Sequence, residues 1–176
     1  MISTIHGAVG LCLLLSIGRS TAQSYWSLPV SVSNYDAFGL NGGGPIDFSG
    51  SDMLHIKVRV ASGSADVQLR IDLNEGGVST SAIPVVLEVG TTWVDVTVNY
   101  DGKWGHWDGN GSVNPANVDS LTFFGNAGGS WAGTIELADL SHSGVDLTAG
   151  RIFWGLSGEA TYIEEPGTPL IRCAHI

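Results

Sequence analysis

Apolar and polar residues alternate along most of the chain after residue 23. In segment 54–60, Leu, Ile and Val alternate with His, Lys and Arg, and a period of two is typical of a strand with one buried face. Segment 67–73 repeats this pattern. The turn-forming residues Ala61–Ser64 lie between the two segments, so the sequence predicts a β-hairpin here.

Further alternating segments occur at 85–89, 94–100, 121–123 and 135–139, and no segment outside the N-terminal region has helical apolar spacing. Seven or eight short strands must bury their apolar faces against one another. A chain of 176 residues has the usual size of one domain. The expected fold class is therefore all-β, a two-sheet antiparallel β-sandwich.

The N-terminal 22 residues have the features of a secretory signal peptide. An apolar run at Gly7–Gly18 precedes the small residues of Ser20–Ala22, which predicts cleavage before Gln23. The alternative is an uncleaved anchor, but the run is shorter than the roughly 20 residues that span a bilayer. We therefore expect a secreted, extracellular protein with three parts. These are a signal peptide (1–22), a β-sandwich domain (23–145) and a C-terminal extension or linker stub (146–176).

The charge balance limits the possible partners. The chain has 7 Lys and Arg residues against 17 Asp and Glu residues, a formal net charge of -10. Such a surface repels phosphate backbones and anionic lipids, so we expect neither nucleic-acid nor membrane binding. Neutral ligands remain open, and so do hard cations such as calcium. Cys12 lies in the signal peptide and Cys173 is near the C-terminus, so no intramolecular disulfide is expected after cleavage.

The longest irregular segment, Asp101–Asp119, is the best candidate for a binding loop, because long ordered loops are usually functional. It holds two tryptophans with polar neighbours, and a further tryptophan lies in another Gly-rich loop. Indole faces stack on the apolar faces of sugar rings, while polar groups fix the hydroxyls. The alternative is that these rings plug the end of the sandwich. The candidate carbohydrate-binding residues are Trp104, Trp107, Trp131, Tyr100, His106 and Asp108.

Two other motifs in this loop give weaker signals. Segment 108–112 has the oxygen spacing of a calcium loop, but Val113 stands where that loop requires Gly, so a solvated turn is preferred. Asn110-Gly-Ser112 is also an N-glycosylation sequon.

Several short motifs resemble the galactose-binding-domain-like jelly rolls, which are common as carbohydrate-binding modules of secreted polysaccharide-degrading enzymes. The motifs are Gly44–Ser49 before segment 54–60, then Thr92–Val98, Asn117–Phe123 and Gly133–Leu140. The resemblance covers residues 30 to 142. It implies a jelly roll that binds a glucan-like polysaccharide or oligosaccharide.

The same resemblance implies a structural calcium ion. Many relatives carry two successive Asp residues in the final strand, where this chain has Ala138 and Asp139. We therefore expect Asp139 to be a metal ligand, with Asp47 as a second.

The leading hypothesis is a non-catalytic polysaccharide-binding module that aids polysaccharide degradation, either secreted alone or cut from a larger enzyme with a catalytic domain. One alternative is a jelly-roll glycoside hydrolase or polysaccharide lyase. The carboxylate pairs Asp101 with Asp108, or Glu136 with Asp139, could then act as glycosidase groups, although surface carboxylates are the preferred interpretation. The nucleophile-elbow and zinc-protease motifs are absent. Another alternative is a structural or adhesive extracellular protein.

Overall fold

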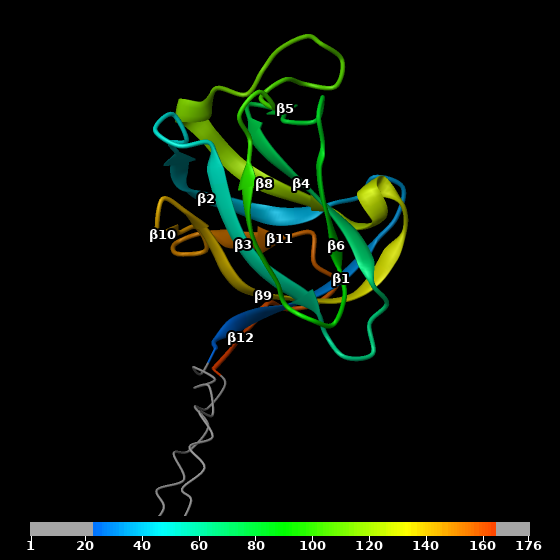
Figure 1. The fold of residues 1–176 in the computed structure, drawn as a ribbon. Coiled ribbons are helices and arrows are strands. Elements are labelled where there is room, and N and C mark those ends of the chain that lie inside the picture. The colour runs from blue at the N-terminus through cyan, green and yellow to red at the C-terminus, as the bar shows by residue number, and fades with distance from the viewer. Residues whose placement is uncertain (1–22, 165–176) are drawn as a thin grey trace, which may run out of the picture.

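The structure, a computed structural model, describes residues 23–164, which form two antiparallel sheets packed face to face (Figure 1). Sheet A contains β1 (Tyr25–Val32), β3 (Met53–Val60), β7 (Val94–Asn99), β9 (Trp131–His142), β10 (Val145–Asp146) and β12 (Thr161–Ile163). Sheet B contains β2 (Phe38–Ile46), β4 (Val67–Glu75), β5 (Val78–Ser79), β6 (Val85–Val89), β8 (Val118–Phe124) and β11 (Ile152–Trp154). The predicted all-β two-sheet sandwich is confirmed.

The strand order places β9 and β8 near the middle of the two sheets. Sheet A has the order β12-β1-β9-β3-β7, with β10 also on β9, and sheet B has the order β11-β2-β8-β4-β5, with β6 also on β4. Two short 3-10 helices, η1 (Pro115–Asn117) and η2 (Gly125–Gly128), flank β8. Among the described residues, no helix is long and apolar enough to cross a membrane.

The hydrophobic core lies between the sheets and follows the period-two pattern. In β3, the apolar residues from Leu54 to Val60 are fully buried, and those of β4 from Val67 to Leu73 face them across the core. Burying one such side chain stabilises the fold by about 1.5–3 kcal/mol. The intervening residues consequently point outward from each sheet.

The predicted hairpin between segments 54–60 and 67–73 is wrong. Strand β3 pairs with β7 and β9 in sheet A, whereas β4 pairs with β5, β6 and β8 in sheet B. The turn at Ala61–Ser64 carries the chain from one sheet to the other. Turn residues and alternation are the same for both arrangements, so the sequence pattern did not distinguish strands that pair from strands that face each other.

The segment predicted as a C-terminal extension from residue 146 adds edge strands to both sheets. Strand β11 pairs with β2, and β12 pairs with β1. Trp26 of β1 packs against Phe153 and Tyr162, with ring centroids 5.3 and 5.1 Å away. The sandwich thus continues to Ile163, through strands of three residues that are too short to show a period. The predicted signal peptide, Cys173 and the last part of the predicted linker lie outside the described residues.

The predicted irregular segment connects β7 to β8. It lies at the end of the sandwich opposite to the two ends of the described chain (Figure 1). The loop is therefore distant from Gln23 and Glu164, the two ends of the described chain.

Candidate functional site

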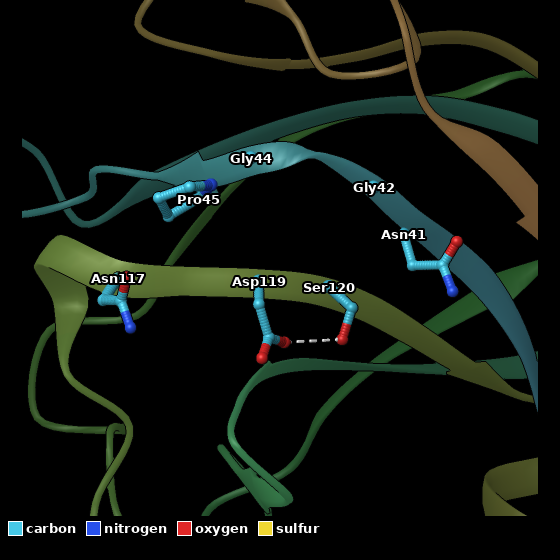
Figure 2. A pocket seen from close by; sticks show the side chains of 7 residues that line it. All are labelled: Asn41, Gly42, Gly44, Pro45, Asn117, Asp119 and Ser120. Atoms are coloured by element: carbon cyan, nitrogen blue, oxygen red, sulfur yellow. Dashed lines mark hydrogen bonds between the residues drawn. The ribbon is translucent and has the colours of Figure 1, made fainter.

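The outer face of sheet B is polar and holds two clefts. On β4, the residues Arg70, Asp72 and Asn74 point away from the core, because they alternate with buried apolar residues. The first cleft, which we call the polar cleft, has a volume of about 570 Å³ and lies over β2 and β8. Figure 2 shows the side chains of Asn41 and Ser120 there.

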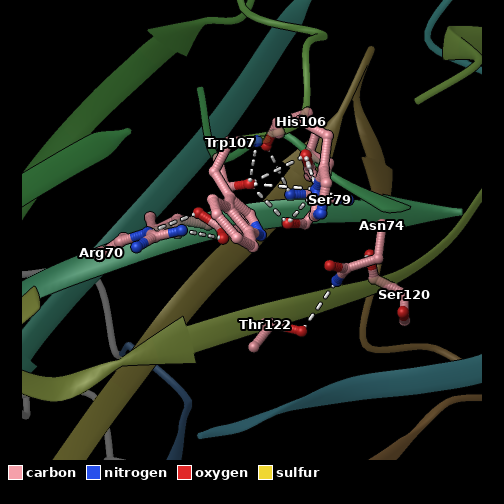
Figure 3. Close-up of polar contacts among 12 residues, drawn as sticks. Arg70, Asn74, Ser79, His106, Trp107, Ser120 and Thr122 are labelled. Carbon is pink, nitrogen blue, oxygen red and sulfur yellow. Dashed lines mark hydrogen bonds and ion pairs between the residues drawn. The ribbon is translucent and has the colours of Figure 1, made fainter. Parts of the chain in front are cut away.

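The second cleft, which we call the aromatic cleft, has a volume of about 480 Å³. Its walls include Tyr35, Trp107 and Phe124, and its floor is formed by polar residues of β4 and the β5 region. Tyr35 is 71% exposed and Trp107 is 73% exposed. Figure 3 shows the indole of Trp107 lying over β4, near Arg70. Apolar rings around a few fixed polar groups are typical of ligand sites.

The floor of the aromatic cleft is an internal ion pair. Nε and Nη2 of Arg70 donate to the two carboxylate oxygens of Asp72 at 2.9 and 2.6 Å. The Asp72 residue is only 1% exposed, and the guanidinium carbon of Arg70 lies 4.9 Å from the ring centroid of Phe124. A bidentate pair of this kind is geometrically fixed. The floor therefore presents oriented polar groups with no net charge from the pair.

Backbone hydrogen bonds fix the loop that carries Trp107. Gly105 and Ser112 form an isolated β-bridge, and the amide of Val113 donates to the carbonyl of Trp104 at 2.8 Å. The amide of Trp107 donates to Oγ of Ser81 at 3.1 Å. The loop backbone is thus tied to the edge of sheet B, while the Trp107 ring extends into solvent.

His106 and Asp108 support the same loop from either side of Trp107. The backbone N–H of Ser79 donates to Nδ1 of His106 at 3.2 Å. Nε2 of His106 lies 4.0 Å from a carboxylate oxygen of Asp108. The backbone N–H of Asn110 donates to the Asp108 carboxylate at 2.8 Å and holds its pKa below the ordinary value. His106 therefore contacts Ser79, which lines the aromatic cleft, whereas Asp108 contacts only its own loop.

Trp104 and Tyr100, also predicted as binding residues, pack toward the core. Nε1 of Trp104 donates to Asp52 at 3.1 Å, and its ring lies 5.9 Å from that of Phe48. The hydroxyl of the fully buried Tyr100 donates to the carbonyl of Ile71 at 3.1 Å, and burial raises its pKa. The aromatic cleft includes neither ring.

Trp131 is likewise buried, at the start of β9. It is 6% exposed, and its Nε1 donates to the carbonyl of Ala65 at 3.2 Å. Of the six predicted binding residues, the structure places only Trp107 in the lining of the aromatic cleft, with His106 and Asp108 next to it in the same loop. It places Trp104, Tyr100 and Trp131 in packing positions.

Tyr35 is a residue of the cleft that sequence reasoning missed. Asn34 and Tyr35 both have positive φ, 46° and 66°, in the turn between β1 and β2, a conformation that is costly for a residue with a side chain. The amide of Tyr35 donates to the carbonyl of Gly128 at 2.8 Å. A Cβ built on Gly128 would overlap the Tyr35 ring, so the ring can occupy this position only because residue 128 has no side chain. The turn signal at Asn34 could have drawn attention to this loop.

Arg70, Asp72 and Phe124 were also missed as site residues. The alternation of apolar and polar residues in β4 and β8 does indicate that these side chains point away from the core. Their meeting across the sheet depends on the register between β4 and β8, in which Arg70 pairs with Phe124.

The two predicted calcium ligands have different surroundings. The Asp139 carboxylate lies 3.4 Å from Nε2 of His55 on the outer face of sheet A. The Asp47 carboxylate accepts the backbone N–H of Ser49 at 2.8 Å, and hydrogen bonding from Ser49 lowers its pKa. Within residues 23–164, no group of three His, Cys, Asp or Glu side chains could hold a metal ion. Calcium takes about six to eight oxygen ligands, so the ion stays a prediction that elemental analysis of the purified protein can test.

No protein-family model, curated protein or solved structure matches this chain. The fold and the clefts define an antiparallel β-sandwich with an aromatic-walled cleft on one outer face. The resemblance to galactose-binding-domain-like jelly rolls stays a hypothesis.

Proposed function

We propose that this protein is a non-catalytic, secreted module that binds a polysaccharide or oligosaccharide in the aromatic cleft and thereby aids polysaccharide degradation. The observation that carries the proposal is the exposed Trp107 ring held over a polar floor. The backbone of Trp107 is anchored, yet its ring stays in solvent, so the fold does not gain the free energy of burying this ring. Contact with a ligand would recover that burial.

The chemistry of the cleft suits a sugar. Tyr35 and Trp107 offer aromatic surfaces to the apolar C–H faces of pyranose rings. Arg70, Asn74 and Ser79 offer hydrogen-bonding groups nearby for the hydroxyls. Because the chain carries a formal net charge of -10, a neutral glycan is favoured over an anionic one.

The positions of the carboxylates support binding over catalysis. Glu136 pairs with Arg59, and Asp139 contacts His55, both on sheet A. The carboxylate in the floor of the aromatic cleft, Asp72, is engaged by Arg70 through both oxygens. A glycosidase requires two carboxyl groups across the scissile bond, and the described lining of this cleft offers only this one.

A screen of the purified protein against soluble and insoluble polysaccharides tests the proposal. Affinity electrophoresis and pull-down should show retention by at least one neutral polysaccharide, with glucans the expected class. Reducing-end and unsaturated-product assays on the same samples should show no cleavage. Release of products would favour a hydrolase or lyase, and failure to bind any glycan would favour a structural or adhesive protein.

A further inference from the structure

The polar cleft lies on the same face as the aromatic cleft and is not used by the proposed function. Its lining includes Asn41, Asn117, Asp119 and Ser120, together with glycines of β2. In Figure 2, the side chains of Asn41 and Ser120 extend from neighbouring strands. The lining carries no aromatic residue, so this cleft offers a ligand hydrogen bonds and contact with the Pro45 ring, but no stacking surface.

A row of polar residues joins the two clefts. Asn41 of β2 pairs with Ser120 of β8, Ser120 pairs with Asn74 of β4, and Asn74 pairs with Ser79 of β5. Ser79 lines the aromatic cleft, whereas Asn41 and Ser120 line the polar cleft. Neighbouring strands lie about 4.8 Å apart, so a row across four strands spans roughly 14 Å. The row runs at a right angle to the strands.

The amide of Asn74, at the centre of the row, is held in place by hydrogen bonds. Nδ2 of Asn74 donates to Oγ1 of Thr122 at 2.8 Å, which orients the amide at the centre of the row (Figure 3). Beyond Asn41, β2 continues through Gly42 and Gly44, which have positive φ of 82° and 83°. A Cβ on either glycine would meet nothing within 4 Å. These two glycines therefore add no side chain to the polar cleft, and the Arg151 side chain lies beside them, where its Nη2 donates to the carbonyl of Gly44 at 2.9 Å.

The polar groups of the polar cleft favour an uncharged, hydroxyl-bearing ligand. Asp119 places a carboxylate there, which accepts the hydroxyl of Ser120 at 2.9 Å and the backbone N–H of Gly76 at 2.9 Å. A negative group on the ligand would be repelled at this point. Within the described chain, the exposed side-chain amide of Asn41 has no hydrogen-bond partner, so both its donor and its acceptor face the ligand space.

We propose that the ligand is a linear, neutral glycan chain that crosses the strands from the aromatic cleft to the polar cleft, where Asn41 and Ser120 form a second subsite. This inference rests on the proposed function and deepens it. Because Gly42 and Gly44 add no side chains above β2, the glycan chain can continue across β2 toward β11, and the protein recognises units within a chain.

Calorimetric titration with cello-oligosaccharides and laminari-oligosaccharides, from disaccharide to hexasaccharide, tests the inference. For the series that binds, affinity should rise with length until both clefts are filled and then stay constant. Asn41→Ala should weaken binding of the longest oligomer by about three- to tenfold, the effect of losing one or two hydrogen bonds. The same variant should leave binding of the shortest oligomer unchanged.

Ser31→Ala serves as the control, since Ser31 is an exposed strand residue on sheet A. It should bind every oligomer as the wild type does. Affinity that does not depend on length, or equal binding of the longest oligomer by Asn41→Ala and the wild type, would overturn the second subsite and leave the aromatic cleft in place. If the wild type binds neither series, the proposed glucan ligand itself fails.

Discussion

Trp104 and Trp107 lie three residues apart in one loop and have opposite surroundings. Trp104 donates its indole N–H to Asp52 and packs against the core, whereas Trp107 is 73% exposed over the outer face of sheet B. The β-bridge between Gly105 and Ser112 begins directly after Trp104, and Trp107 lies in the segment that this bridge closes. One residue type therefore has a structural role at the first position and is available for binding at the second.

The first prediction concerns the structural ring. Trp104→Ala should lower the free energy of unfolding by about 3 kcal/mol, because it removes a large, partly buried ring and leaves Asp52 without its donor. Urea unfolding followed by circular dichroism measures this. An unfolding free energy within about 0.5 kcal/mol of the wild type would show that Trp104 does not support the core.

The second prediction concerns the role of Gly128 in positioning the Tyr35 ring. Gly128→Ala puts a methyl group where the Tyr35 ring lies, at a φ of 109° that disfavours side chains. Sugar binding should fall as far as it does in Tyr35→Ala. Gly129→Ala is the matched control, since the Cβ would be 3.4 Å from its nearest neighbours, and it should bind normally. If Gly128→Ala binds normally and Tyr35→Ala does not, the glycine does not position the ring.

The third prediction concerns the floor of the aromatic cleft. Asp72→Asn should destabilise the fold by about 3–5 kcal/mol, because it leaves the largely buried Arg70 guanidinium without its anionic partner. Glu88→Gln is the control on a neighbouring strand, where the exposed side chain accepts a hydrogen bond from Gln68 at 2.8 Å. It should change stability by less than about 0.5 kcal/mol. Equal unfolding free energies for both variants would contradict this role of the pair.

The fourth prediction is a dependence on alkaline pH. Burial raises the pKa of Tyr100 above the ordinary value of 10.0, so the unfolded chain loses this proton before the folded protein does. The contribution of Tyr100 to stability is complete below pH 10 and declines as pH rises further, by up to about 1.4 kcal/mol per pH unit.

Unfolding free energies of the wild type and Tyr100→Phe across this alkaline range measure the effect. The decline should be less steep in Tyr100→Phe, which cannot ionise at this position. Parallel declines in the two proteins would exclude the buried phenol as the cause.

Much of the sandwich could be predicted from the sequence, because alternation directly reports which side of a strand is buried. The pairing of strands could not. Segments 54–60 and 67–73 have the same pattern whether they pair or face each other, and only the packed core decides between them. The edge strands β11 and β12 are too short for any period.

The candidate site was predictable in part. The loop around Trp107 was indicated by its length and its rings, but composition alone could not separate Trp107 from Trp104, since only packing distinguishes them. Tyr35 reaches the cleft through a positive φ and a glycine more than 90 residues away in the chain. Arg70 meets Phe124 only through the register of β4 with β8.

The most direct measurement is the affinity of Trp107→Ala for the polysaccharide that the wild type binds best, taken together with its melting temperature. Stacking of one ring contributes about 1–3 kcal/mol, so binding should weaken by roughly tenfold or more, while the melting temperature stays nearly unchanged. Tyr162→Ala, which removes a 51% exposed ring from sheet A, should bind as the wild type does. Wild-type affinity in Trp107→Ala would contradict binding at the aromatic cleft.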